Sequence, residues 1–138
     1  MYGQVYIPPS IQHEIEAGGK AKIGVSELRR AKFIQVIPLL DPSRAALLSD
    51  LDLGEAEVIT LAQEINADLV IIDERLARSH AKRLGLTVTG VLGVLIKSKE
   101  IGYITTVAPL IQQLQEGGIH LSNELKDKVL HIAGETLE

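Results

Sequence analysis

Three carboxylates stand where an α/β chain would gather polar side chains at one edge of its sheet. Asp73 follows the uninterrupted apolar run 69–72, Glu55 lies in the first turn of a predicted helix, and Glu14 lies near the mouth of the first crossover. Carboxylates in such positions repel one another unless a cation lies among them, and their hard oxygens suit Mg²⁺ or Mn²⁺. The pattern therefore favours metal-assisted hydrolysis of a phosphodiester.

Each of these acids also has an ordinary structural interpretation. Asp73 precedes a helix, so its carboxylate is suited to cap that helix by accepting a backbone N–H. Glu55 follows Asp52 at the spacing of a capping box. Glu14 is by default a solvated surface residue. Only the three acids taken together point to a cation site.

Further charged residues flank the three acids. Glu57 and Glu74 are either outer metal ligands or solvated side chains. Arg75, Arg78 and Lys82 share one face of the helix that follows the third acid. Cationic groups on such a face either hold RNA phosphates or form an ordinary solvated surface.

The spacing of apolar residues and of turn residues predicts the elements that position these side chains. The predicted strands are 5–7, 33–39, 69–72 and 86–89, and the predicted helices are a first one opened by Pro8-Pro9-Ser10 and ended by Gly18-Gly19, then 26–31, 53–66, 76–84, 91–100, 106–116 and 122–133. The run 69–72 does not alternate, as expected of an inner parallel strand covered on both faces.

The strand–helix–strand unit over 69–89 gives the topology. Such crossovers are right-handed, so Asp73 is expected at the carboxyl end of an inner parallel strand, in a solvent-reachable crevice. Strands dominate the first two thirds of the chain and helices the end. We therefore predict a single α/β domain over 1–138, with a mostly parallel sheet and a helical C-terminal cover.

Composition excludes several classes of protein. The chain has no cysteine, so disulfides and thiolate metal sites are excluded and a reducing compartment, the cytoplasm, is expected. There is no signal-peptide pattern and no apolar run near the roughly 20 residues that cross a bilayer, so no membrane partner is expected. The net charge of -4 argues against duplex-DNA binding, and 3% aromatic residues supply few stacking platforms.

The histidines do not add to the predicted metal site. His13, His80, His120 and His131 are scattered, and none forms a ligand pair such as H-E-x-x-H. His80 falls on an apolar helical face. It is therefore predicted to be a core or boundary residue.

Four segments resemble the PIN superfamily of Mg²⁺-dependent ribonucleases: Y-G-Q-V-Y-I-P-P-S-I-Q-H-E at 2–14, L-G-E-A-E at 53–57, V-I-I-D-E-R-L-A-R-S-H-A at 70–81 and L-G-L-T-V-T-G-V-L-G-V-L at 84–95. The last is similar to a mostly uncharacterised branch related to the toxins of VapBC-type toxin–antitoxin pairs. The resemblance implies a PIN-like three-layer α/β/α fold. It also implies an N-terminally truncated one, because family members begin with a strand and about two helices before the segment similar to 2–5.

In that family four acids surround the metal. Glu14, Glu55 and Asp73 match the second, third and fourth of them, and the first has no counterpart here. The resemblance thus implies that these three residues are catalytic acids and Mg²⁺ or Mn²⁺ ligands.

The expected function is a PIN-like Mg²⁺-dependent endoribonuclease of the toxin–antitoxin type, or a truncated and weakly active relative. Its expected partners are single-stranded RNA and an antitoxin protein. The alternative is a catalytically silent PIN-like module for binding or oligomerisation. Because a truncated sheet exposes strand edges and apolar surface, a homodimer is also expected.

Overall fold

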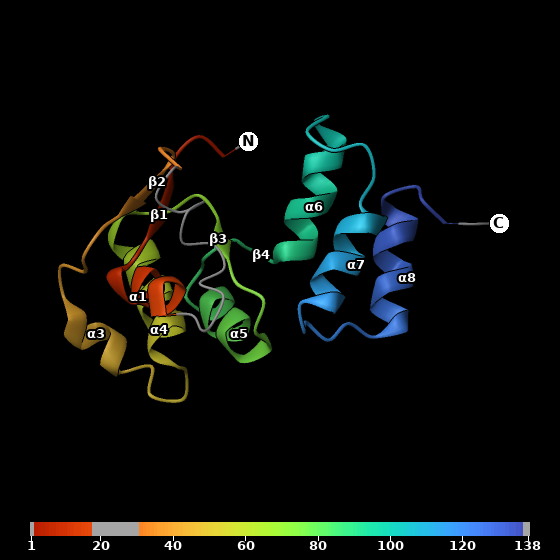
Figure 1. Cartoon of the computed structure of the whole chain (residues 1–138). Helices are drawn as coiled ribbons and strands as arrows, with labels where there is room; N and C mark the ends of the chain where they lie inside the picture. The colour runs from red at the N-terminus through yellow and green to blue at the C-terminus, as the bar shows by residue number, and fades with distance from the viewer. Residues whose placement is uncertain (1, 18–30, 137–138) are drawn as a thin grey trace. The chain divides into compact units, whose positions relative to one another are not determined.

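The computed structural model describes residues 2–17 and 31–136, and the chain divides into two compact units, Met1–Val88 and Thr89–Glu138 (Figure 1). The first unit contains β1 (Val5–Ile7), α1 (Pro9–Ala17), β2 (Ile34–Val36), α3 (Pro42–Ala46), α4 (Leu53–Glu64), β3 (Val70–Ile71) and α5 (Arg75–Arg83). The second contains α6 (Val91–Glu100), α7 (Ala108–Glu116) and α8 (Asn123–Ile132), and β4 (Val88–Thr89) spans the boundary. These elements confirm the predicted α/β class. The predicted helix 26–31, apart from its last residue, and the Gly18-Gly19 terminator lie outside the described residues.

The strands are short and pair in twos. β1 and β2 are parallel, with Val5 opposite Ile34, as predicted for a mostly parallel sheet, and β3 pairs with β4. The prediction that an inner strand precedes Asp73 is wrong for the described residues, because β3 has a single hydrogen-bonded neighbour there. Only one face of the run is buried: Val70 and Ile72 pack among side chains of α4 and α5, while Ile71 is 45% exposed.

Helix α4 is the centre of the first unit and packs against α1, α3, β3 and α5. It begins with the predicted capping box: the N–H of Glu55 donates to Asp52 at 2.8 Å, and the N–H of Asp52 donates to Glu55 at 3.3 Å. The core around it consists of the buried residues Ile59, Ala62, Val70, Ile72, Ala77 and Ala81. Burial of each larger aliphatic side chain contributes about 1.5–3 kcal/mol to stability.

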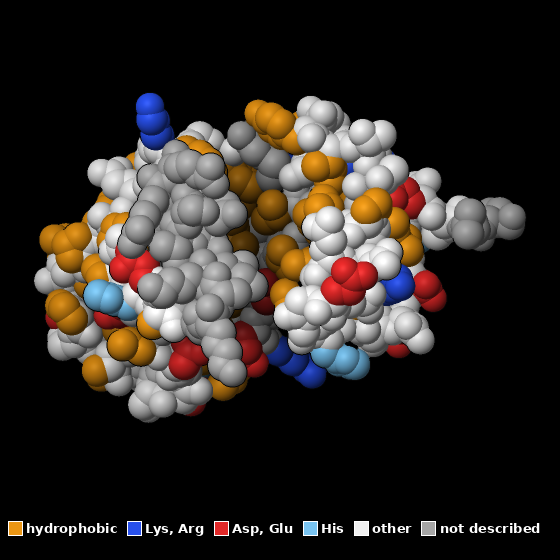
Figure 2. Space-filling view, in the orientation of Figure 1, with side chains coloured by type: hydrophobic (Ala, Val, Ile, Leu, Met, Phe, Trp, Pro, Cys, Tyr) orange, Lys and Arg blue, Asp and Glu red, His pale blue; other side chains and the backbone are white. Residues whose placement is uncertain are grey.

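A glutamate side chain of α4 holds the segment that leads into α3 by accepting two backbone N–H groups. The carboxylate of Glu64 accepts the N–H groups of Leu40 at 2.8 Å and Asp41 at 2.9 Å, and Asp41 in turn caps α3 by accepting the N–H of Ser43. Leu40 and Leu47 flank α3 and are 87% and 82% exposed. Figure 2 shows hydrophobic side chains on the surface over α3. The first unit therefore has an exposed apolar side chain on each side of α3.

The second unit is helical, as predicted for the C-terminal cover. Its buried residues are Val107, Ile111 and Val129. None of the helices in the described part of the chain is long and apolar enough to cross a membrane.

A carboxylate after α8 ties the second unit together. Glu135 accepts the N–H groups of Val107 at 2.7 Å and Ala108 at 3.1 Å, and it pairs with the ammonium group of Lys99 at 2.9 Å. Burial raises the pKa of Glu135, but the hydrogen bonds from these three donors together outweigh burial, so the net pKa lies below the ordinary value. The ionised form therefore links the start of α7 to the ends of α6 and α8.

Glu135→Gln is expected to lower the free energy of unfolding at neutral pH by about 1–3 kcal/mol, because charge-assisted hydrogen bonds are lost and Lys99 loses its counterion. Since the folded pKa is lowered, this stabilisation is fully present above the ordinary value of 4.5 and is lost as the pH falls through the folded value. Urea unfolding at neutral pH and at about pH 3 measures both effects. Asp127→Asn, exposed on α8, is the charge-matched control. An equal loss in the control at neutral pH would contradict the prediction.

Candidate functional site

Glu14 lies on α1 against the first turn of α4. Gly54 is buried in that turn, and a Cβ there would lie only 2.6 Å from Oε1 of Glu14. The missing side chain therefore creates the space in which the Glu14 carboxylate packs. Sequence reasoning missed this role of Gly54; the signal was a glycine in the first turn of a helix, where backbone can be approached closely.

Glu14 and Glu57 share one surface depression. They line an open hollow of about 510 Å³, which is completed by Pro9, Ser10, His13, Ala17 and Leu53. Glu57 is half-buried and Glu14 is exposed. The structure therefore brings Glu14 together with the acid that the sequence assigned only an outer role.

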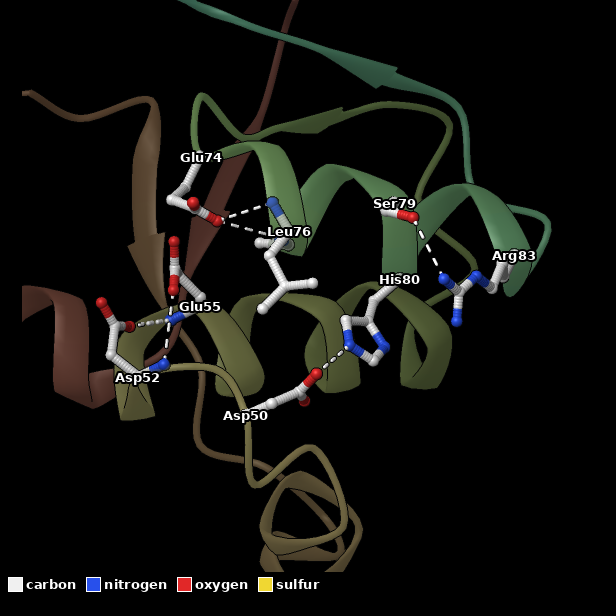
Figure 3. Close-up of polar contacts among 9 residues, drawn as sticks. Asp50, Asp52, Glu55, Glu74, Leu76, Ser79, His80 and Arg83 are labelled. Atoms are coloured by element: carbon white, nitrogen blue, oxygen red, sulfur yellow. Dashed lines mark hydrogen bonds and ion pairs between the residues drawn. The ribbon is translucent and has the colours of Figure 1, made fainter.

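Glu55 is separated from Glu57 by one residue, so the two project to different sides of α4. Its carboxylate lies toward Glu74 at the start of α5 (Figure 3). Burial raises the pKa of Glu55, the hydrogen bond from the Asp52 backbone lowers it, and the negative charges of Asp52 and Glu74 raise it. The net pKa is above the ordinary value, chiefly because burial disfavours the charged form and secondly because two acids lie nearby.

Asp73 lies exposed in the turn between β3 and α5. The alternative in which Asp73 caps α5 is wrong, because the cap is Glu74, whose Oε2 accepts the N–H groups of Leu76 at 2.8 Å and Ala77 at 3.1 Å (Figure 3). Asp73 instead lines an open hollow of about 420 Å³ together with Arg75, Arg78, Ser79 and Lys82. Asp73 is thus reachable by solvent, but the strand before it is not an inner strand in the described residues, and its hollow is not the one that Glu14 lines.

The three basic residues predicted to contact RNA all line this hollow, but their surroundings differ. Arg75 and Lys82 are exposed. Arg78 is half-buried, and its Nη1 donates to the carbonyl oxygen of Ile72 at 2.8 Å. Arg78 is therefore anchored to the end of β3, immediately before Asp73.

His80 is a boundary residue, in agreement with the prediction. Its ring nitrogen Nε2 lies 2.8 Å from Oδ2 of Asp50 in the loop before α4 (Figure 3). The hydrogen bond with His80 is the main reason that the pKa of Asp50 lies below its ordinary value. The pair joins α5 to the segment that leads into the capping box, so His80 has a structural partner.

The acids of the described residues are distributed rather than gathered. Over 2–17 and 31–136, no group of three or more His, Cys, Asp or Glu side chains lies where it could hold one metal ion. This arrangement does not fit a magnesium centre built on three carboxylates, since Mg²⁺ demands near-octahedral oxygen ligands at short distance. The assignment of Glu14, Glu55 and Asp73 as metal ligands therefore stays a prediction.

Glu55→Gln is expected to raise the free energy of unfolding at neutral pH by about 0.2–0.5 kcal/mol, because it removes like-charge repulsion. The amide oxygen still accepts the N–H of Asp52. Since the folded pKa of Glu55 is raised, the wild-type penalty is full only above the folded pKa, shrinks as the pH falls through it, and is absent below the ordinary 4.5, so the gain should disappear over the same range. Denaturant unfolding across a pH series measures it. A gain of the same size in Glu57→Gln, on the other side of α4, would argue against the stated cause.

Comparison with known proteins identifies the family. The family model DUF3368, described as a PIN domain, matches residues 1–135 and thus runs through both compact units. Searches of curated proteins and of solved structures gave no significant match. The matched range includes the three candidate acids and the basic face of α5. The chain belongs to the PIN-domain superfamily.

Proposed function

We propose that this chain is a PIN-type endoribonuclease, dependent on Mg²⁺ or Mn²⁺, that cuts single-stranded RNA weakly. The observation that carries the proposal is the family match over residues 1–135, because the PIN domain is a nuclease-like fold and PIN domains typically depend on a divalent metal. We assign Glu14, Glu55 and Asp73 as the catalytic acids, and the absence of a metal-holding group of three acids among the described residues is one reason to expect weak cleavage. Glu57 and Glu74 lie beside them as auxiliary acids.

The placement of each acid supports this assignment in a different way. Asp73 is exposed and lines the hollow that also contains Arg75, Arg78 and Lys82. Glu14 lies in the space left by Gly54. Glu55 has a raised pKa in a locally negative environment. Carboxyl groups with shifted pKa values are enriched at functional sites.

Weak activity follows from what the neighbouring acids already do. The Glu55 carboxylate accepts the N–H of Asp52, and the Glu74 carboxylate accepts two N–H groups of α5. A metal that recruited either one would compete with a helix cap, whose loss costs about 1 kcal/mol. Because Glu55 and Glu74 already serve as helix caps, a second candidate function is a catalytically silent PIN-like module for binding or oligomerisation.

The 138-residue chain, purified free of nucleases, is expected to cleave single-stranded RNA weakly or not at all even with ample Mg²⁺ or Mn²⁺. Any cleavage should require the metal and disappear in Asp73→Asn, with Asp68→Asn, exposed before β3, as the matched control. Gel analysis of a labelled RNA, with EDTA in a parallel reaction, measures this.

Robust cleavage abolished by Asp73→Asn would contradict the weak-activity prediction. Another acid, such as Glu57, Glu74 or one from a partner chain, would then complete the site. Cleavage that persists in EDTA or in Asp73→Asn would overturn the nuclease assignment. Complete absence of metal-dependent cleavage would favour the silent module.

We further propose that the chain acts in the cytoplasm, with an antitoxin protein and a second copy of itself as partners. The exposed apolar residues around α3 support a protein partner. Leu40 and Leu47, on either side of α3, are 87% and 82% exposed, and a protein partner would remove such apolar side chains from water.

Light scattering at high protein concentration is expected to report a dimer. Leu47→Asp should shift the equilibrium toward the monomer, because a charge would be desolvated in a shared apolar interface. Ile101→Asp, at an exposed position in the second unit, is the control. A monomer at every concentration would remove the self-association proposal.

A further inference from the structure

The hollow beside Asp73 is strongly cationic. Its lining residues include three basic side chains, Arg75, Arg78 and Lys82, and one carboxylate. The basic residues follow one another along a single face of α5, at intervals of three and four positions. The chain as a whole carries a net charge of -4, so this concentration of positive charge runs against its composition.

The N-terminus of α5 is already partly occupied. Oε2 of Glu74 accepts the N–H groups of Leu76 and Ala77, two of the four unpaired amides that a helix start offers. The donors that line the hollow are side chains. Side-chain donors, unlike backbone amides, can be removed one at a time by substitution.

Arg78 is the donor whose position the fold determines. Its Nη1 bond to the Ile72 carbonyl, 2.8 Å long, holds a half-buried guanidinium beside the turn that carries Asp73. A guanidinium has five N–H donors in a rigid plane, so one backbone bond leaves donors for a second acceptor. Lysine, with a compact point charge, cannot serve two acceptors in the same fixed geometry.

Ser79 adds a hydroxyl to the same hollow. Its Oγ accepts a long hydrogen bond of 3.5 Å from Nη2 of Arg83, on the next turn of α5 (Figure 3). The hydroxyl hydrogen then remains for an acceptor of its own, since a hydroxyl both accepts and donates. The lining thus combines one fixed guanidinium, one hydroxyl and two exposed cations.

We infer that this hollow is a subsite for one phosphate of a single-stranded RNA backbone, and that Arg78 is the residue that positions the subsite next to Asp73. The inference rests on the proposed function for the nature of the ligand. Arg75 and Lys82 supply mobile charge to the phosphate, while Arg78 supplies directed hydrogen bonds. A phosphate held there lies beside a proposed catalytic acid and aligns the strand along α5.

The test measures binding apart from cleavage. Fluorescence anisotropy with a labelled RNA of about ten nucleotides, in EDTA and at several salt concentrations, gives the affinity and its salt slope. Arg75→Gln and Lys82→Gln are each expected to weaken binding and to make the log–log slope shallower by about 0.7. Lys128→Gln, which removes an exposed charge on α8 outside the hollow, should leave both unchanged.

Arg78→Lys separates position from charge. It keeps the positive charge but loses the planar donor edge, so its affinity should fall toward that of Arg78→Gln while thermal unfolding confirms a folded chain. Wild-type affinity in Arg78→Lys would overturn the positioning role. Equal behaviour of Arg75→Gln, Lys82→Gln and Lys128→Gln, or no RNA binding by the wild type, would overturn the subsite.

Cleavage assays on the same variants keep this inference distinct from the proposed function. Salt-dependent binding that responds to Arg75→Gln and Lys82→Gln, without any metal-dependent cleavage, would remove the nuclease and leave the subsite standing. Metal-dependent cleavage that is unaffected by all three hollow variants would remove the subsite and leave the nuclease.

Discussion

The first turn of α4 is the constraint on which the first unit depends. The free N–H groups of that turn must be satisfied, and the reciprocal bonds of Asp52 and Glu55 do so. Gly54 in the same turn leaves the space taken by Glu14. Four elements, α1, α3, β3 and α5, pack on α4. If this helix began at another residue, the space that holds Glu14 and the position of the Glu55 carboxylate would both change.

In the same turn, the Glu55 side chain both caps the helix and carries a charge close to other acids. The cap needs an acceptor at Glu55, and that acceptor stands near the negative charges of Asp52 and Glu74. A carboxylate in the first turn also lies at the positive end of the helix dipole, which favours a negative charge there. The helix start therefore accounts for both the acceptor and its charge, while burial and the two neighbouring acids account for the raised pKa of Glu55.

Local patterns in the sequence were sufficient to predict most helices and strands. They were also sufficient to predict helix caps formed by residues close together in sequence. The helix beginning at Leu53 and its capping box were predictable because both depend on residues within one turn of each other. The inner position of β3 was not predictable. A continuous apolar run predicts burial on both faces, but here Val70 and Ile72 are buried against helices while Ile71 between them is exposed.

The candidate site was predictable as a set of residues and not as a geometry. Asp73 and Glu74 are adjacent acids before the same helix, and only the extended backbone at Glu74 determines which of them caps it. The separation of Glu55 from Glu57 follows from their spacing on one helix, but the contact of Glu14 with Gly54 joins residues that are distant in sequence. Such a contact depends on how helices pack, which no window of sequence contains.

The basic face of α5 carries this argument one step further. Its spacing gives Arg75, Arg78 and Lys82 the same helical face, which would make them equivalent ligands for an anion. They are not equivalent once folded, because an exposed arginine or lysine loses roughly 2 kcal/mol of rotamer entropy when a ligand immobilises it. Arg78 has already lost part of that freedom through its bond to the Ile72 carbonyl. In the proposed subsite, a phosphate would therefore find Arg78 already in place, while Arg75 and Lys82 would have to be ordered. Arg78 is held by the carbonyl of Ile72, the residue directly before Asp73.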